Sequence, residues 1–325
     1  LLSCQREPGL TADGVWRTGT FSDHCSLLSQ LRILLSDFDK NDLAILESVA
    51  AAAKKMTVFA EAMQKSNGSA PSFDDSSDKS FARKLTGTRR ALAGAGFAKN
   101  APQRKVTPPR MTDTYVFRDA QYFVSHSTLK VVPESSLVIL HADAASFATS
   151  DPGGVTLAFA YGASDLLVRA EPPEGESRRE TEFRFDPALR NGYHIDGAGR
   201  GGDAPINPNA ARLEKSWRGP GWAAARSVDE TNPTGSITRT VIHLKVEHAL
   251  VVVDEFSAKS GQEAAFEQFW QIASGLSPAP SDGPQYRFDI AGKGGLTAAF
   301  DAPAKTTIEP RGEGSCIRRE LRMAK

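Results

Sequence analysis

The sequence predicts an α+β protein in which a helical region is followed by an antiparallel β-sandwich. Apolar residues recur at helical spacing over residues 21–65. After Pro108 and Pro109 the apolar pattern changes to the period of two that is typical of β-strands. Pro and Gly clusters separate many short segments of this second kind. Short strands joined by turns favour an antiparallel sandwich over a parallel sheet with crossover helices.

Two amphipathic helices are expected in the first part of the chain. Leucines recur at helical spacing over residues 21–38, and Ser22 or Asp23 can serve as the N-cap. A second apolar stripe, which includes Met56 and Met63, predicts a helix over about residues 41–65. The short turn between them makes an antiparallel helical hairpin, whose apolar faces need further helices or a neighbouring domain to cover them.

The composition excludes several classes of function. Among 325 residues, 39 basic side chains balance 39 acidic ones, so no overall charge favours nucleic acid or an anionic membrane as a partner. No apolar run approaches the roughly 20 residues that a membrane-spanning helix needs. The three cysteines are scattered without a CxxC pair, which argues against a zinc knuckle or a disulfide framework. The chain opens on Leu1 without Met or a signal peptide, so we expect a fragment or a processed form.

Residues 81–110 contain no Asp or Glu, and Gly, Ala and Pro dilute them. We expect a mobile basic linker between a helical domain over 1–80 and a sandwich over 111–325. The alternative is a positively charged rim that attracts an acidic polymer. The basic residues of this stretch are Arg83, Lys84, Arg89, Arg90, Lys99, Arg104, Lys105 and Arg110.

Polar groups at strand ends are the best candidates for chemistry in the second part. His141 follows an apolar strand, and Asp143 lies two residues further on, so both can face one cleft if the strand continues that far. His194 also lies where a strand end meets a loop. His243 and His248 lie in or beside a strand pair and are predicted to be structural.

The polar segment 197–233 is predicted to be a surface excursion, because it is rich in Gly, Asn and Pro. Its GAGRGG run at 197–202 precedes no helix, which excludes a dinucleotide-binding loop. Trp217 and Trp222 could stack on sugar rings or pack over the edge of the sandwich.

Several motifs, in this order, resemble those of the heparinase II/III-like polysaccharide lyases. The segment ADGVWRTGTFSDHCSLLSQL is similar to a toroid segment of that family, and HADAASF resembles its His-x-His-x-Asp-x-x-Ser-Phe motif. LAFAYGA and RNGYHIDGAG resemble later sandwich motifs. The resemblance implies that the helices of 1–80 are part of an α/α toroid, that the active cleft lies between toroid and sandwich, and that the protein is periplasmic or extracellular.

The resemblance implies β-elimination of a uronic-acid-containing acidic polysaccharide of heparin, heparan or alginate type. Elimination removes the C5 proton, neutralises the adjacent carboxylate and protonates the leaving oxygen, which suits Tyr, His, Asn and Arg side chains. The alternatives are a catalytically degenerate polysaccharide-binding protein of the same fold, and a hydrolase or epimerase that uses the same cleft. The candidate catalytic residues are His24, His141, Tyr161 and Asn191, and the candidate substrate-binding residues are Arg190, His194, Trp217 and Trp222.

The chain departs from the family pattern at several positions. Ile139 stands where the first motif His, an acid/base or charge-neutralising residue, is expected, and Asp23 falls at the toroid Tyr. Ala160 and Arg190 replace two zinc ligands, which leaves His141 as the one metal candidate. One imidazole cannot hold zinc in the usual four-ligand way, so we expect neither zinc nor another cofactor.

A structural interpretation stays open for each candidate. His24, in the first turn of its helix, is either a surface or cap-region residue or lines a substrate groove. His141 could be a hydrogen-bonded strand-end residue, and Tyr161 an aromatic at the sandwich edge. Asn191 also fits a turn, and His194 could face solvent.

Overall fold

The computed structural model describes most of the helical part and most of the strands. The described residues are 9–16, 21–37, 43–71, 81–94, 113–128, 134–143, 154–168, 191–195, 210–232, 235–258, 264–274, 276–279, 285–290, 294–300, 305–311 and 314–323. None of the helices among them is long and apolar enough to cross a membrane.

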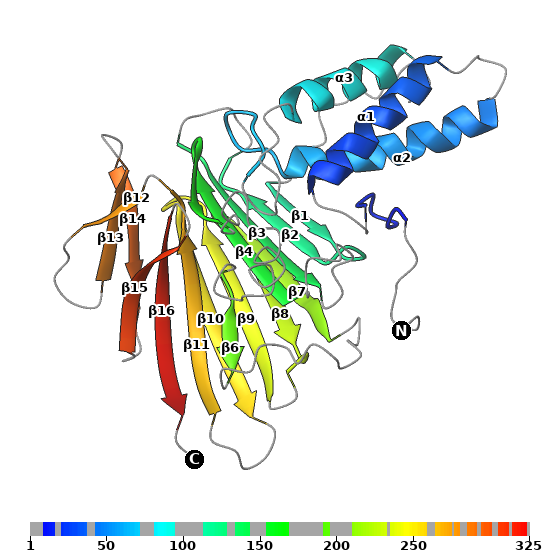
Figure 1. Cartoon of the computed structure of the whole chain (residues 1–325). Helices are drawn as coiled ribbons and strands as arrows, with labels where there is room; N and C mark the ends of the chain where they lie inside the picture. Colours follow the sequence, from blue (N-terminus) through cyan, green and yellow to red (C-terminus); the bar gives the residue numbers. More distant parts are fainter. Residues whose placement is uncertain are drawn as a thin grey trace.

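Three helices precede the strands (Figure 1). The first two, α1 (Phe21–Asp37) and α2 (Leu43–Ala62), match the two predicted helices to within a few residues. Their apolar faces are covered as expected, because they pack on each other, on α3 (Phe81–Gly94) and on the sheet that follows. Over the described residues, these helices show a helical region before the sandwich but do not show an α/α toroid.

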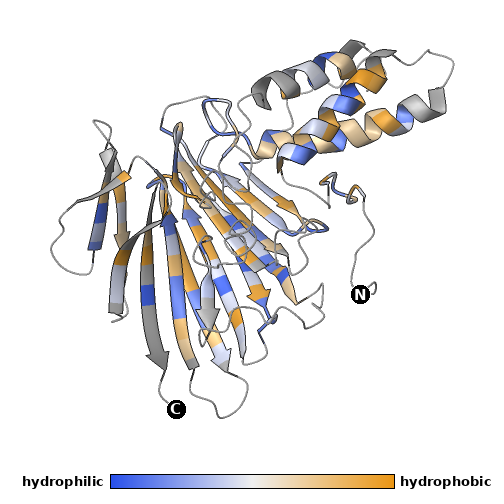
Figure 2. Ribbon diagram, viewed as in Figure 1, coloured by the Kyte–Doolittle hydropathy of each residue, from blue (hydrophilic) through white to orange (hydrophobic). Residues whose placement is uncertain are grey.

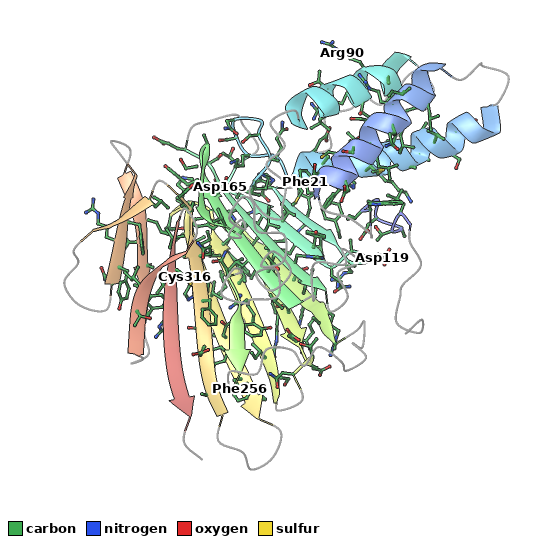
Figure 3. All side chains as sticks on the ribbon, in the orientation of Figure 1. Phe21, Arg90, Asp119, Asp165, Phe256 and Cys316 are labelled. Atoms are coloured by element: carbon green, nitrogen blue, oxygen red, sulfur yellow. The ribbon has the colours of Figure 1, made fainter. Side chains whose placement is uncertain are left out.

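Helix α3 corrects the expectation of a linker over 81–110. Leu85 and Thr88 are buried, and Arg89 binds Glu61 of α2 at 2.7 Å. Arg90 points away from the other helices (Figure 3). Some of the basic side chains thus belong to the solvent-facing side of an amphipathic helix. A charge count alone does not distinguish such a helix from a solvated linker. The remainder of the predicted linker lies outside the described residues.

A nine-stranded antiparallel sheet forms the centre of the molecule. Its strand order is β1-β2-β3-β4-β5-β11-β16-β15, with β6 paired to β11. The strands are β1 (Thr114–Phe117), β2 (Tyr122–His126), β3 (Ser136–Asp143), β4 (Gly154–Tyr161), β5 (Ser164–Leu167), β6 (Tyr193–Ile195), β11 (Ala264–Ile272), β15 (Lys305–Arg311) and β16 (Gly314–Met323).

A smaller four-stranded sheet, of order β10-β9-β8-β7, completes the sandwich. A three-stranded sheet of order β12-β13-β14 adds Leu276 and Phe288 to the same core. All of these strands pair antiparallel, as the sequence predicts. The strands are β7 (Ala211–Gly219), β8 (Trp222–Asp229), β9 (Gly235–Leu244), β10 (Ala249–Ala258), β12 (Leu276–Ala279), β13 (Gln285–Ile290) and β14 (Gly294–Ala299).

Strands β3 and β4 of the large sheet are covered on both faces, which accounts for the almost continuous apolar run of β4 (Figure 2). Side chains alternate between the two faces along each strand. The helix face packs against α1 and α2 and includes Leu137, Ile139, Ala158 and Ala160. The sandwich face packs against the small sheet and includes Val138, Leu140, Leu157 and Phe159.

The predicted surface excursion over 197–233 is wrong for its second half. Strands β7 and β8 form a long hairpin at the edge of the small sheet. The inward side chains of β8 are Ala223, Ala225 and Ser227, all fully buried. Alanine and serine are not strongly apolar, so the alternation of buried and exposed residues along β8 does not appear as an alternation in hydropathy. Two further segments have the apolar pattern of strands, TLKVV at 128–132 and TEFRF at 181–185, and they lie largely or wholly outside the described residues.

Candidate functional site between the helices and the large sheet

His24 joins the two long helices from inside the core. It lies in the first turn of α1 and is 1% exposed. The backbone N–H of Trp16 donates to Nδ1 at 3.3 Å, so the ring proton lies on Nε2, which is 3.0 Å from the carbonyl oxygen of Met56 in α2. Burial lowers the pKa of His24 to about 4, although the bond to Met56 opposes this shift. The imidazole is therefore neutral near pH 7, with both nitrogens engaged.

A line of aromatic rings connects His24 to His141. The Phe59 ring lies 5.0 Å from the His24 ring and 5.0 Å from the Tyr122 ring, edge to face in both pairs. Tyr122 and His141 are stacked, with ring centroids 3.8 Å apart and planes within 10°. The two residues sit opposite each other on β2 and β3, and both are half-buried. We call Phe59, Tyr122 and His141 the aromatic junction.

The strand that carries His141 continues to Asp143, which is the condition for the two residues to lie on the same face. The side chain of Asp143 is outside the described part of the structure. Residues two apart on β3 share a face, which places His141 and Ile139 on the helix face. Tyr122 was missed by sequence reasoning, because only the register of β2 against β3 brings it to His141.

Two contacts at the end of α2 hold the helices on the sheet. Nε2 of His126 in β2 lies 2.7 Å from the carbonyl oxygen of Ala62, and burial lowers the pKa of His126. Just beyond the helix, Lys65 forms a 2.8 Å ion pair with Asp165. Nearby, the pKa of Tyr115 is raised, first by burial and then by the charges of Glu61 and Asp113. The C-terminal end of α2 is thus bonded to β2 and to the residues at the start of β5.

Tyr161 belongs to a different group, at the other end of β3. Its ring meets that of His248 edge to face at 5.2 Å, and it lies opposite Ser136 in register. Ser136 Oγ is 3.1 Å from His248 Nδ1 and 2.8 Å from His243 Nε2, and Ser125 Oγ is 2.9 Å from His243 Nδ1. Burial, followed by the charge of Lys245, lowers the pKa of His243 to about 3. This chain of hydroxyls and imidazoles lies between the two sheets and not at the junction.

Asn191 closes a gap in the large sheet where β5 is short. Its amide nitrogen donates to the carbonyl oxygens of Leu157 at 2.7 Å and Val168 at 3.0 Å. Its amide oxygen accepts from the backbone N–H of Gln271 at 2.6 Å, and its own carbonyl accepts from Arg239 of the small sheet. The side chain takes the place of strand-to-strand hydrogen bonds among β4, β5 and β11. Asn191 is fully buried.

The Arg239 that binds Asn191 is part of a buried ion pair. Arg239 meets Asp254 of β10 through two bonds of 2.7 Å, and neither side chain is exposed by more than 1%. Gln268 donates to Asp254 at 2.9 Å, and the guanidinium lies 5.1 Å from the Tyr193 ring centroid. Burial, then the charge of Asp229, raises the pKa of Tyr193 well above its usual value. These groups connect the two sheets through side chains.

The structure describes the side chains of only two of the four predicted substrate-binding residues. Arg190 lies outside the described residues. His194 lies in β6 opposite Glu267, but its side chain is likewise not described. Trp217 and Trp222 lie on β7 and β8, on the face of the small sheet that points away from the large sheet. The structure therefore brings together His24 and His141, and leaves the two tryptophans elsewhere.

The positions that resemble family zinc ligands and the first motif His do not fit a metal. Ile139 is 0% exposed and Ala160 only 3%, and both pack on the helix face among apolar neighbours. Among the described residues, no three His, Cys, Asp or Glu side chains gather as metal ligands.

Comparison with known proteins bears on this arrangement. No protein-family model and no curated protein matches the chain. Among solved structures, it is similar to the heparan sulfate lyase HepC from Pedobacter heparinus, with 14% identity, a TM-score of 0.71, and coverage of 96% of this chain and 51% of that one. It is also similar to a heparinase III gene product, with 14% identity, a TM-score of 0.75 and the same coverage. A further heparinase III structure has 14% identity and a TM-score of 0.65, and the match covers 96% of this chain and 55% of that one.

The fold resembles that of the heparan sulfate lyases. The family resemblance predicted from the motifs is confirmed at the level of the fold. The chain spans about half the length of the solved structures that it matches. At 14% identity the similarity concerns the fold alone.

Proposed function

We propose that this chain is a lyase-like protein that binds a uronic-acid-containing acidic polysaccharide where the helices meet the large sheet, and cleaves it by β-elimination. The observation that carries the proposal is the lyase-like fold over 96% of the chain, combined with a stacked phenol and imidazole at that boundary. On this proposal α1 to α3 are part of an α/α toroid, and the protein is periplasmic or extracellular.

The aromatic junction offers groups that elimination requires. An imidazole and a phenol can remove the C5 proton and protonate the leaving oxygen, and His141 and Tyr122 are both half-buried. Arg190, which stands where the family resemblance places a zinc ligand, is proposed to neutralise the uronate carboxylate. Catalytic roles for His24, Tyr161 and Asn191 stay predictions; His24 and Asn191 have their polar groups bonded within the fold.

A second candidate function is polysaccharide binding without cleavage. It is favoured by Ile139 and Ala160, which stand at positions of a family acid/base or charge-neutralising histidine and of a zinc ligand. Both are buried apolar residues that support the packing of the helices. A protein that retains the fold with these replacements can keep a polymer-binding boundary while losing proton transfer.

The test incubates the protein with heparan sulfate and with alginate, and follows both the ultraviolet absorbance of unsaturated uronate and binding by calorimetry. We expect absorbance to develop, and expect His141→Ala to lower its rate about 10²- to 10⁴-fold, as removal of a general acid or base does. His248→Ala is the matched control, because His248 is also half-buried but lies between the sheets. Binding without absorbance supports the second candidate, and absence of binding contradicts both.

A further inference from the structure

The outer face of the β7–β8 hairpin carries two tryptophans. In register, Trp217 lies opposite Ala224, and Trp222 lies opposite Gly219. The alternate residues Ala223 and Ala225 are fully buried in the core between the sheets. Trp217 and Trp222 therefore share the face that points away from that core. Trp222 is 37% exposed, which is high for a large apolar side chain in a strand.

The Trp222 ring is held flat across the neighbouring strand. A Cβ placed on Gly219 would lie 2.3 Å from the Trp222 Nε1 atom, so the indole rests directly against the glycine backbone. The hairpin turn ends in Gly221 at φ +76°, and its carbonyl accepts from the N–H of Lys245 in the next hairpin at 2.8 Å. The indole is thus oriented before any ligand arrives, which lowers the entropic cost of binding.

An uncompensated positive charge lies beside these rings. The Nζ of Lys215 is 5.3 Å from the Trp217 ring centroid. Two other basic residues of the hairpin are neutralised, since Arg212 pairs with Glu230 and Arg226 pairs with Glu214. Lys215 is exposed and has no carboxylate partner among the described residues.

We propose that Trp217, Trp222, Gly219 and Lys215, the indole platform, bind an acidic sugar chain at a second site. Sugar rings stack through their C–H groups on the indoles, and a carboxylate or sulfate of the chain meets the Lys215 ammonium. Both sheets separate the platform from the aromatic junction, so the two sites are independent. The ligand class rests on the proposed function, while the site itself rests on the hairpin.

The experiment measures calorimetric binding of a heparan sulfate oligosaccharide to the protein and to single variants. We expect Trp222→Ala and Lys215→Gln each to weaken binding at one of two sites about tenfold. Trp222→Phe should keep most of the affinity that Trp222→Ala loses. The matched controls are Arg212→Gln, a paired cation of the same strand, and Val253→Ala, an exposed apolar residue of the same sheet at 45% exposure. Both controls should bind as the unaltered protein does, and an uncharged glucan should bind weakly.

The two proposals fail separately. His141→Ala should leave the platform affinity unchanged, and the control Val253→Ala should leave the elimination rate on a short oligosaccharide unchanged. Platform binding without elimination contradicts only the proposed function. Equal affinity of Trp222→Ala and the unaltered protein overturns the platform. The platform is also overturned if Trp222→Ala changes the sedimentation of the protein but not its affinity for the oligosaccharide. The face would then be an interface between two copies of this chain.

Discussion

The two faces of the large sheet bury polar side chains in different ways. On the helix face, His24 and His126 bond to backbone carbonyls of α2, and aromatic rings fill the space between. On the sandwich face, side chains bond to other side chains, as in the Arg239–Asp254 pair and the His243 hydroxyl chain. The difference shows that the helix face depends on where α2 lies, while the sandwich face depends on matched charges and hydroxyls.

This difference also separates fully buried histidines from a half-buried one. His24, His126 and His243 are buried, with ring nitrogens engaged within the protein. His141 is half-buried and lies flat against Tyr122 at the helix boundary. Among these four, it is the one that is partly exposed.

The largest effect is expected where the sandwich face depends on charge. Asp254→Ala leaves the buried Arg239 guanidinium unpaired and removes the acceptor of Gln268, so we expect a loss of about 5 kcal/mol in the free energy of unfolding. Urea denaturation measures it. Glu255→Ala, the exposed next residue, should change that free energy by about 0.5 kcal/mol or less. A similar loss in both variants would contradict a special role for the buried pair.

A slightly smaller effect is expected on the helix face. Phe59 contacts the rings of His24, Phe117 and Tyr122, and it is 2% exposed. Phe59→Ala should cost about 3 to 4 kcal/mol of the free energy of unfolding, because it leaves a cavity between helix and sheet. Val58→Ala, on the exposed side of α2, should cost about 0.5 kcal/mol or less. Equal costs, measured by urea denaturation, would show that α2 does not depend on this packing.

The sequence predicts the parts of the fold whose own pattern is strong. Helices α1 and α2 and strands such as β3 and β9 carry apolar periodicity over their whole length, so they can be recognised without knowledge of their neighbours. Helix α3 is amphipathic in its own sequence, and only a charge count makes it look like a linker. The β7–β8 hairpin cannot be recognised locally, because its inward side chains are small, so its structure is set by tertiary packing.

The candidate site is predictable only in part for the same reason. His141 can be found because it ends an apolar strand, but Tyr122 becomes its partner only through the register of two strands. Asn191 looks like a turn residue in the sequence, yet its amide joins three segments of the sheet. Interactions that depend on pairing between distant segments leave no mark in the local sequence.

The smallest expected effect is a pH dependence that comes from the buried histidines. The pKa of His24 is about 4 in the folded protein against 6.5 in the unfolded chain, so the unfolded chain binds more protons as the pH falls below 6.5. Stability is therefore complete above pH 6.5 and decreases as the pH falls toward 4. One pKa unit corresponds to about 1.4 kcal/mol, which gives a loss of about 2 kcal/mol from His24 by pH 5. His243, whose pKa is about 3, adds to the loss in the same direction.

The range from pH 6.5 to 5 tests this, because carboxylates with ordinary pKa values near 4 contribute little there. Urea denaturation at steps of pH measures the loss directly. Nuclear magnetic resonance of the His24 imidazole ring measures its titration in the unaltered protein, so this second measurement needs no variant. The ring signal should not titrate over this range in the folded protein. Titration near pH 6.5 would mean that water reaches His24, and α1 would then be packed less tightly on α2 than its 1% exposure indicates.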